Sequence, residues 1–471
     1  MSILKFVFIA LEVLLLFNLL IFVHELGHFL AARWRGLKIE RFAIWFGKPI
    51  WKAKINGVEY ALGTIPAGGY VSLPQMASME AIEGKGESSG EPLPPISALD
   101  KIIVAFAGPL FSFLLALAFA IVVMVVGRPV SEAETTTTIG YVEKDGPAAK
   151  VGVRPGDRIL AVDGQPVTKF GGMGDSVTWR VVRSTGDTVP VKVEREGKVL
   201  EFNPVPAKEE TKFWQRKGLR QIKIAPAQSA IIAEVAPNGP AAAAGLERGD
   251  HILSVNGVKL WHFGGMGEYL EEHPEGKLNL EVERGGKCFA VSLTPERPIS
   301  PPNEKPKLGI LWDANGKTTL VHPGAFEQVS ASVSSMFETF GALFSKKTDI
   351  KPQHLGGAVK IMDVYARLFS SEQGWRLALW FSVLMNVNLA FLNLLPVPVL
   401  DGGHILLSIV EGLRRKPISI RIISAIQTTC AVLLIGFMVY IAFYDVQDLP
   451  WKRGKEKPVE VKFAPKVPVK S

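Results

Sequence analysis

The chain has 471 residues, 48% of them hydrophobic, and a formal net charge of +8. This length allows several domains, and the apolar share suits a protein that lies partly in a membrane and partly outside it. The two cysteines, Cys288 and Cys430, fall in segments of different character, which makes a disulfide framework improbable. We interpret the positive charge as lysine and arginine beside membrane spans, and not as a nucleic-acid-binding surface.

The first predicted element is an apolar helix over residues 6–32, with the sequence LLIFVHELGHFLA at 20–32. His24 and His28 are four residues apart, so both imidazoles lie on one helix face, about one turn apart. Two ligands of one zinc ion need this spacing, and Glu25 between them suits a general base. Histidines that only form hydrogen bonds are the alternative. Three ionisable groups in hydrocarbon are costly, however, and favour a functional site.

Three further apolar stretches are long enough to cross a bilayer, which takes about 20 residues, and they cover 102–126, 377–395 and 422–443. Basic residues follow the first span and lie between the third and fourth. The positive-inside rule then places the N-terminus outside, 33–101 in the cytoplasm and 127–376 outside. The C-terminus is also outside in this arrangement, although its tail is basic. The histidines lie towards the cytoplasmic side of the bilayer.

The predicted outer segment contains an internal repeat. Residues 146–174 read GPAAKVGVRPGDRILAVDGQPVTKFGGMG, and residues 239–267 read GPAAAAGLERGDHILSVNGVKLWHFGGMG. Each copy combines a short helix signal, a Gly-Asp turn and an alternating apolar strand, which indicates two copies of one module. The pattern resembles PDZ domains, which bind extended peptides by strand addition and often capture a C-terminal carboxylate. Two β-rich spacers that bind nothing are the alternative.

A catalytic zinc with two histidine ligands needs a third protein ligand, and a water takes the open position. The best candidate is Asp401 in the sequence NLLPVPVLDGGH at 393–404, where two prolines break the third span. Irregular backbone at membrane depth occurs only beside protein or a water-filled cavity. Asn388 and Asn393 lie on the same span and could hold an unwound substrate backbone. Ordinary hydrogen bonding between helices is an equally good interpretation of them.

The motif in the first span, the motif in the third and the repeats between them resemble the bacterial site-2 proteases over nearly the whole chain. The resemblance implies that His24, His28 and Asp401 bind one zinc ion per chain and that Glu25 activates the water. It also implies that Asn393 and Asn388 contact substrate. The segment GTIPAGGYVSL at 63–73, with Gly68, Gly69 and Tyr70, resembles a membrane-reentrant β-hairpin that pairs with an unwound substrate helix.

We therefore expect a polytopic α-helical membrane protein with four transmembrane helices and two inserted PDZ-like α/β domains. The expected parts, in chain order, are the first span with the zinc motif (1–34), a cytoplasmic segment with the hairpin and a flexible loop (35–98), the second span (99–127), two PDZ-like domains (128–207 and 208–297), a linker with amphipathic membrane-surface helices (298–375), the third span (376–414), the fourth span (415–445) and a basic tail (446–471).

The expected function is zinc-dependent cleavage of transmembrane segments in single-span proteins, after a first cleavage by another protease. The substrates would be anti-sigma factors or remnant signal peptides at a bacterial inner membrane. The PDZ-like domains would take peptide C-termini, and no nucleic acid is expected as a partner. One rival is a non-catalytic membrane scaffold that holds envelope proteins. A second is a metal transporter. Transporters usually have repeated polar pathway residues across several spans, and we identify none in the second and fourth spans.

Overall fold

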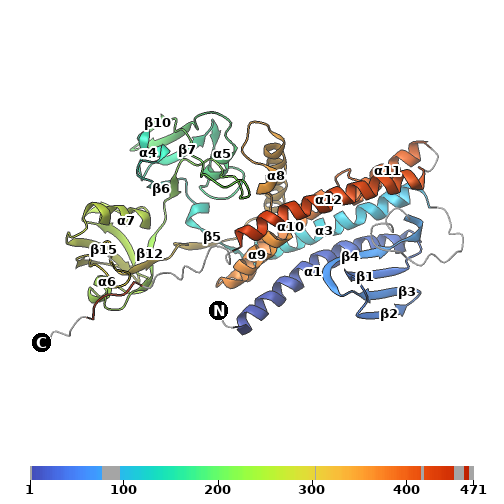
Figure 1. The fold of residues 1–471 in the computed structure, drawn as a ribbon, viewed down its shortest axis with the longest axis horizontal. Helices are drawn as coiled ribbons and strands as arrows, with labels where there is room; N and C mark the ends of the chain where they lie inside the picture. Colours follow the sequence, from blue (N-terminus) through green and yellow to red (C-terminus); the bar gives the residue numbers. More distant parts are fainter. Residues whose placement is uncertain (1–2, 77–95, 303, 415–417, 450–460, 466–471) are drawn as a thin grey trace. The chain divides into compact units, whose positions relative to one another are not determined.

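The structure, a computed structural model, describes residues 3–76, 96–302, 304–414, 418–449 and 461–465 (Figure 1). They form two compact units. The helical unit comprises Met1–Arg128, His322–Phe337 and Leu355–Gln447, and the sheet-rich unit comprises Pro129–Val321, Glu338–His354 and Asp448–Ser471. Most of the loop expected at 74–98 and most of the basic tail lie outside the described residues.

The helical unit contains the four expected spans. They are α1 (Ile3–Trp34), α3 (Ala98–Val126), α10 (Gly374–Asn393) and α12 (Ile420–Asp448). All four are long and apolar enough to cross a membrane, which confirms the prediction and makes the chain a multi-pass membrane protein. Helix α3 packs against both α1 and α10 (Figure 1).

Local sequence explains where these helices begin and end. Ser97 and Asp100 form a capping box that starts α3, in which each side chain accepts a backbone N–H of the other residue. The expected third span, 376–414, is broken at its prolines as predicted, because α10 ends at Asn393 and α11 (Asp401–Arg414) begins after Pro396 and Pro398. The interruption places Asp401 at the start of a new helix.

A four-stranded sheet follows α1 and lies against its C-terminal half (Figure 1). Its order is β2 (Trp51–Ile55), β3 (Val58–Leu62), β1 (Arg41–Phe46) and β4 (Ile65–Ser72). The hairpin expected within 63–73 is wrong in detail, because these residues form the single edge strand β4, which pairs antiparallel with β1. Packing of Phe22 and Phe29 on Phe42 joins the sheet to α1.

The sheet-rich unit contains two modules of similar order. The first has β6 (Ile139–Val142), α4 (Pro147–Lys150), β7 (Arg158–Val162), β8 (Gln165–Pro166), α5 (Val177–Arg183), β9 (Val191–Arg195), β10 (Lys198–Phe202) and β11 (Ile224–Pro226). The second has β12 (Ala230–Val235), α6 (Pro240–Ala243), β13 (His251–Val255), β14 (Val258–Lys259), α7 (Phe263–Glu272), β15 (Leu278–Arg284), β16 (Lys287–Leu293) and β17 (Ile310–Trp312). Each module has its own buried apolar core.

Both modules extend further than the boundaries expected from sequence. Strand β11 pairs with β6, so the first module continues past residue 207. Strand β17 pairs with β12, so the second module continues past residue 297. In each case the final strand returns to the first strand of its module across a long connection, which local sequence patterns do not reveal.

An ion pair between an arginine and a buried carboxylate explains the Gly-Asp turn that both copies share. Arg195 donates to both carboxylate oxygens of Asp157, at 2.6 and 2.7 Å, and to the carbonyl of Gly152. Arg284 makes the same three bonds to Asp250 and Gly245 in the second module. Each arginine therefore fixes the turn that leads into the central strand, β7 or β13, by a bidentate contact.

The repeated FGGMG sequence adopts two different structures. In the first copy, 170–174, it is a loop in which Gly172 and Gly174 have positive φ. In the second copy it forms the start of α7, because the Nδ1 of His262 accepts the N–H of Gly264 and caps the helix. Gly264 also leaves room for Tyr141 of the first module, whose hydroxyl donates to Glu268 at 2.9 Å. Burial and that carboxylate raise the pKa of Tyr141 to about 12.

Between the second module and the last two spans lie two helices that sequence had predicted. They are α8 (Ala325–Phe344) and α9 (Ala358–Ser370), at the amphipathic stretches 324–345 and 354–369. Strand β18 (Thr318–Val321), which precedes α8, pairs with β5 (Arg128–Ser131). The chain thus leaves the helical unit and returns to it on paired strands.

Replacement of Asp157 by alanine should destabilise the first module, because it leaves the Arg195 guanidinium without its buried counter-ion. The loss of hydrogen bonds to a charged group costs about 1.5–3 kcal/mol, and the Arg195 side chain is 23% exposed, so that water can hydrate part of it. Amide hydrogen exchange in β7 and β9 of the full chain should become markedly faster. The control is Arg158→Ala, which removes a solvent-exposed pair with Glu194 and should cost less than about 1 kcal/mol. Equal exchange in the two variants would contradict the assignment.

Candidate metal centre

The two histidines of the first span lie on one face of α1, as the spacing predicted. Both are buried, and their Nε2 atoms are 3.4 Å apart. Both Nε2 atoms also face Asp401, the first residue of α11. The separations are 3.3 Å from His24 Nε2 to Asp401 Oδ2 and 3.4 Å from His28 Nε2 to Asp401 Oδ1. The structure therefore brings together three residues from opposite ends of the chain.

The backbone after α10 folds tightly to deliver Asp401. A Cβ atom on Gly402 would lie 2.2 Å from the carbonyl oxygen of Leu394, and one on Gly403 would lie 2.2 Å from that of Val397. Only glycine allows the start of α11 to pack so closely on the 394–400 segment. These two glycines therefore permit the close backbone approach that places Asp401 beside the histidines.

Helix α3 fixes the orientation of both imidazoles. The Nδ1 of His24 lies 3.0 Å from the hydroxyl of Ser112, and the Nδ1 of His28 lies 2.8 Å from the carbonyl of Val104. A carbonyl only accepts hydrogen bonds, so the Nδ1 of a neutral His28 carries the proton and its Nε2 carries a lone pair. Partners of this kind commonly set the tautomer of metal-binding histidines.

The three side chains fit a metal ion. Tetrahedral zinc has ligand bonds of about 2.0–2.1 Å, which gives ligand-to-ligand distances of about 3.3–3.4 Å. The two Nε2 atoms are 3.4 Å apart, and each lies at a similar distance from one carboxylate oxygen of Asp401, 3.3 Å to Oδ2 for His24 and 3.4 Å to Oδ1 for His28. Among the described residues, these are the histidine, cysteine and acidic side chains that converge closely enough to hold an ion. The Oδ2 of Asp401 is buried without a hydrogen-bond donor, which a cation would remedy.

A cavity of about 250 Å³ opens beside these three residues. It is lined by Glu25 next to the histidines on α1, by Gly68 and Gly69 of β4, and by Asn393 at the end of α10. Gly69 packs against the side chain of Glu25, since a Cβ on Gly69 would lie 3.0 Å from Glu25 Cγ. A carboxylate, a metal-ligand set and an extended strand thus share one cavity within the helical unit.

Other residues that the sequence singled out lie elsewhere. Tyr70 is absent from the cavity lining. It stacks on Phe46, and its hydroxyl accepts from Arg41 at 3.2 Å. Asn388 is also outside the lining. His404 is buried and lines the cavity but does not belong to the converging group.

Comparison with known proteins now identifies the family, because a model of peptidase family M50 matches residues 12–437. The chain belongs to peptidase family M50. The "Regulator of sigma-E protease RseP" of Salmonella typhimurium is 28% identical over 458 residues, which cover 92% of this chain and 97% of the relative. "Protease RseP" of Yersinia pestis is 29% identical, with the same coverage. A Pasteurella multocida protein named as a candidate zinc metalloprotease is also 29% identical, over 92% of this chain and 97% of its own.

This M50 peptidase is therefore a metalloprotease with its active site inside the membrane. Sequence analysis identified the motifs in the first and third spans but did not predict that α3 contacts both histidines. Val104, Gly108 and Ser112 repeat every four residues and continue as Ala116 and Ala120, a small-residue stripe of the kind that lets membrane helices approach closely. That stripe, with one hydroxyl in it, was the signal that could have revealed the contact.

The second and fourth spans contribute buried polar side chains that sequence reasoning did not single out. Ser112 on α3 contacts His24 directly. Gln427 on α12 is buried, and its amide donates to the carbonyl of Pro398 at 3.3 Å, in the interruption before Asp401. In the M50 peptidase both polar side chains serve the metal centre or the segment that supports it, and neither belongs to a repeated pathway.

We expect Gly108→Ala to displace His28, because the added Cβ would lie 2.2 Å from its Nε2. Metal affinity, measured by competition with a chelator, should fall at least about tenfold. The matched control is Gly436→Ala on α12, where a Cβ meets nothing within 4 Å and the affinity should not change. Unchanged affinity in Gly108→Ala would show that His28 is not a ligand in this position.

Ser112→Ala should weaken metal binding by about 10- to 100-fold, since it removes the group that orients His24. The same chelator competition measures the effect. Thr429→Val is the control, because that hydroxyl bonds only the carbonyl of Ala425 in its own helix. Equal affinities in the two variants would mean that Ser112 does not act through His24.

Proposed function

We propose that this M50 peptidase is a zinc-dependent endopeptidase that cleaves transmembrane segments of single-span membrane proteins. The observation that carries the proposal is the convergence of His24, His28 and Asp401, three buried side chains that each place one ligand atom within 4.8 Å of the others. One ion per chain fits this single converging group. The names of relatives that refer to zinc support the choice of metal.

The residues around the cavity divide the chemistry among them. A bound zinc ion supplies a Lewis acid that polarises the scissile carbonyl and acidifies a water molecule. Glu25, adjacent to His24 and in the same cavity, takes the proton of the attacking water and delivers it to the leaving amine. Because the peptide bond is hydrolysed in low-dielectric surroundings, the fixed carboxylate needs little reorganisation during the reaction.

The substrate must lose its helical hydrogen bonds before the scissile bond is accessible. Strand β4 is at the edge of its sheet, and Gly68 and Gly69 on it line the cavity. We propose that β4 pairs with an unwound substrate segment by strand addition, and that Asn393 binds its backbone. Asn388 and Tyr70 then have supporting roles, because neither lines the cavity.

The two modules are proposed to be PDZ domains that bind the C-termini of substrates already cut by another protease. Their final strands, β11 and β17, each pair on one side only among the described strands, so that an edge remains for a peptide. Relatives that carry the name "Regulator of sigma E protease" support a role in a sigma-factor pathway, and we propose anti-sigma factors or remnant signal peptides as the substrates.

We propose that the protein lies in a bacterial inner membrane with its N-terminus, both modules and C-terminus outside. The tail supports this arrangement. Phe463 is buried against Gly239 and Gly309 of the second module, and Lys462 pairs through its backbone with Ser300. A tail that contacts the second module lies on the same side of the membrane as that module, despite its basic residues.

The scaffold and transporter hypotheses have less support. A scaffold has no use for Glu25 beside a ligand set, and a transporter needs a chain of polar sites across the bilayer. Membership of a peptidase family favours hydrolysis over both.

Glu25→Gln tests the mechanism with purified protein in detergent and a single-span substrate trimmed to its first-cleavage product. We expect cleavage to fall at least about 100-fold, because the amide cannot accept the water proton. Zinc content should remain at the wild-type value, since Glu25 is not a ligand. Glu12→Gln, on the same helix but outside the cavity lining, is the control and should cleave normally. Full cleavage by Glu25→Gln, or no zinc in the wild type, would refute the proposed mechanism.

A further inference from the structure

Helix α5 of the first module has two apolar faces. Val177 and Val181 point into the core of the module. Trp179 and Val182 belong to a separate cluster on the other side of the helix. A short helix at the surface of a small module normally presents polar residues on its outer face. The second apolar face therefore needs an occupant.

The occupant is a segment of the same chain, residues 338–354, which we call the strap. It comprises the end of α8 and the loop that follows. Ala342 and Ile350 of the strap are 1% and 4% exposed, and they pack with Val182, Trp179 and Leu219. Leu219 lies on the segment that leads into β11. The strap thus lies between α5 and the approach to the edge strand.

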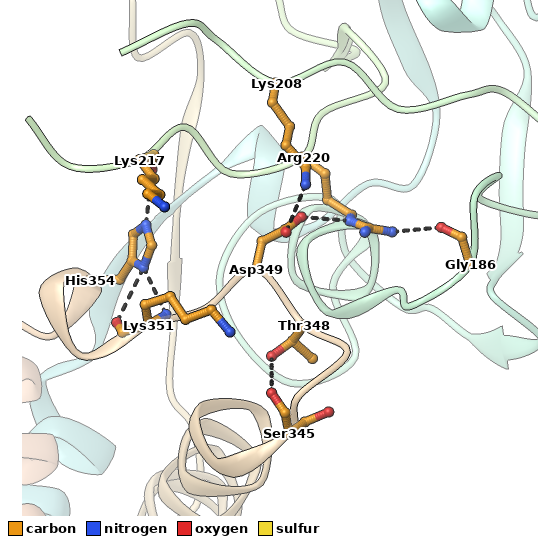
Figure 2. A network of polar contacts seen from close by, with 9 residues as sticks. All are labelled: Gly186, Lys208, Lys217, Arg220, Ser345, Thr348, Asp349, Lys351 and His354. Atoms are coloured by element: carbon orange, nitrogen blue, oxygen red, sulfur yellow. Dashed lines mark hydrogen bonds and ion pairs between the residues drawn. The ribbon is translucent and has the colours of Figure 1, made fainter. Parts of the chain in front are cut away.

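Ionic contacts hold the loop of the strap (Figure 2). The carboxylate of Asp349 accepts from Lys208 Nζ at 2.7 Å and from Arg220 Nε at 3.0 Å. Arg220 is 8% exposed and also donates to the carbonyl of Gly186, which fixes its guanidinium against the module. Two cations therefore bind the carboxylate of Asp349, and an apolar pocket holds the neighbouring side chain of Ile350.

Both ends of the strap are also fastened. The indole of Trp179 donates to Glu338 at 2.8 Å, and Arg183 pairs with the same carboxylate. At the far end, His354 Nε2 lies 2.9 Å from the carbonyl of Lys217 and so donates to it (Figure 2). These contacts keep the strap close to the groove even when its central residues are released.

The second module shows that this arrangement is not a general need of the fold. Its corresponding helix, α7, carries Glu268, Glu271 and Glu272 in its second half, and these side chains contact Tyr141, Lys305 and Lys144. The apolar outer face on α5, with its Trp179 and Val182, is a property of the first module.

We propose that the strap is an internal occupant of the peptide site of the first module, which an external peptide must displace. A peptide added to the free edge of β11 would run between that strand and α5 towards Leu219, the residue before β11 against which Ile350 packs together with Trp179 and Val182 of α5. The ligand class is an extended peptide with a carboxylate next to an aliphatic side chain. The inference rests on the proposed peptide-binding role of the module and does not depend on the metal centre.

A labelled peptide with the sequence of residues 342–351, ALFSKKTDIK, tests the proposal on the full chain in detergent. In the variant Ile350→Asp the strap should leave the groove, and the peptide should bind at least about tenfold more tightly than to the wild type, whose own strap competes. Lys346→Asp, which changes charge at a strap position outside these contacts, should bind like the wild type. A peptide with lysine in place of aspartate should not bind.

Amide hydrogen exchange provides the second readout. Exchange in α5 should be faster in Ile350→Asp than in the wild type, whereas exchange in β9 should be unchanged, which shows that the module remains folded. Equal peptide affinity in wild type and Ile350→Asp, or no binding to either, would overturn the proposal. Because the readout is peptide binding, failure of the zinc mechanism would leave these results unaffected.

Discussion

The structure of the helical unit depends on one constraint, the cost of holding two imidazoles and a carboxylate in apolar surroundings. Each polar atom there needs a partner, because unpaired polar groups in hydrocarbon cost several kcal/mol. Ser112 and the carbonyl of Val104 occupy both Nδ1 atoms, so that the Nε2 atoms turn towards Asp401. Close packing of α3 on α1 follows, and Gly108 is the position where a side chain would prevent it.

The same constraint explains the interruption between α10 and α11. An acidic side chain must reach the histidines, and the first turn of a helix suits it because backbone N–H groups there favour negative charge. The prolines end α10, the glycines let α11 pack against the interruption, and Gln427 bonds the exposed carbonyl of Pro398. Protein groups thus provide the hydrogen bonds and packing that the irregular backbone needs and that lipid cannot provide.

Sequence predicted the parts of this molecule that local patterns specify. The four spans, the histidine pair, the repeat and the helices at 324–345 and 354–369 all follow from periodicity, apolar length or spacing. It did not predict contacts between distant segments. The return of β11 to β6 moved a module boundary, and residues 63–73 became an edge strand because β1 was available as its partner.

The two FGGMG copies show that identical local sequence does not determine local structure, even over five residues. His262 caps the second copy into a helix, whereas Lys169 precedes a loop in the first. The ligand set was accessible from sequence because metal chemistry restricts the residue types. The supporting carbonyl of Val104 on α3 was not, since a backbone carbonyl leaves no trace in sequence, and Ser112 was marked only by its place in a stripe of small residues.

The separation of the ligands along the chain has a consequence for biosynthesis. His28 is inserted with the first helix, but Asp401 follows more than 370 residues later, after both modules and α10. During synthesis the two histidines lie in the membrane beside α3 before Asp401 has been made. A nascent or truncated chain therefore holds an incomplete site, and His24, His28 and Asp401 come together only when the insertion of the chain is nearly finished.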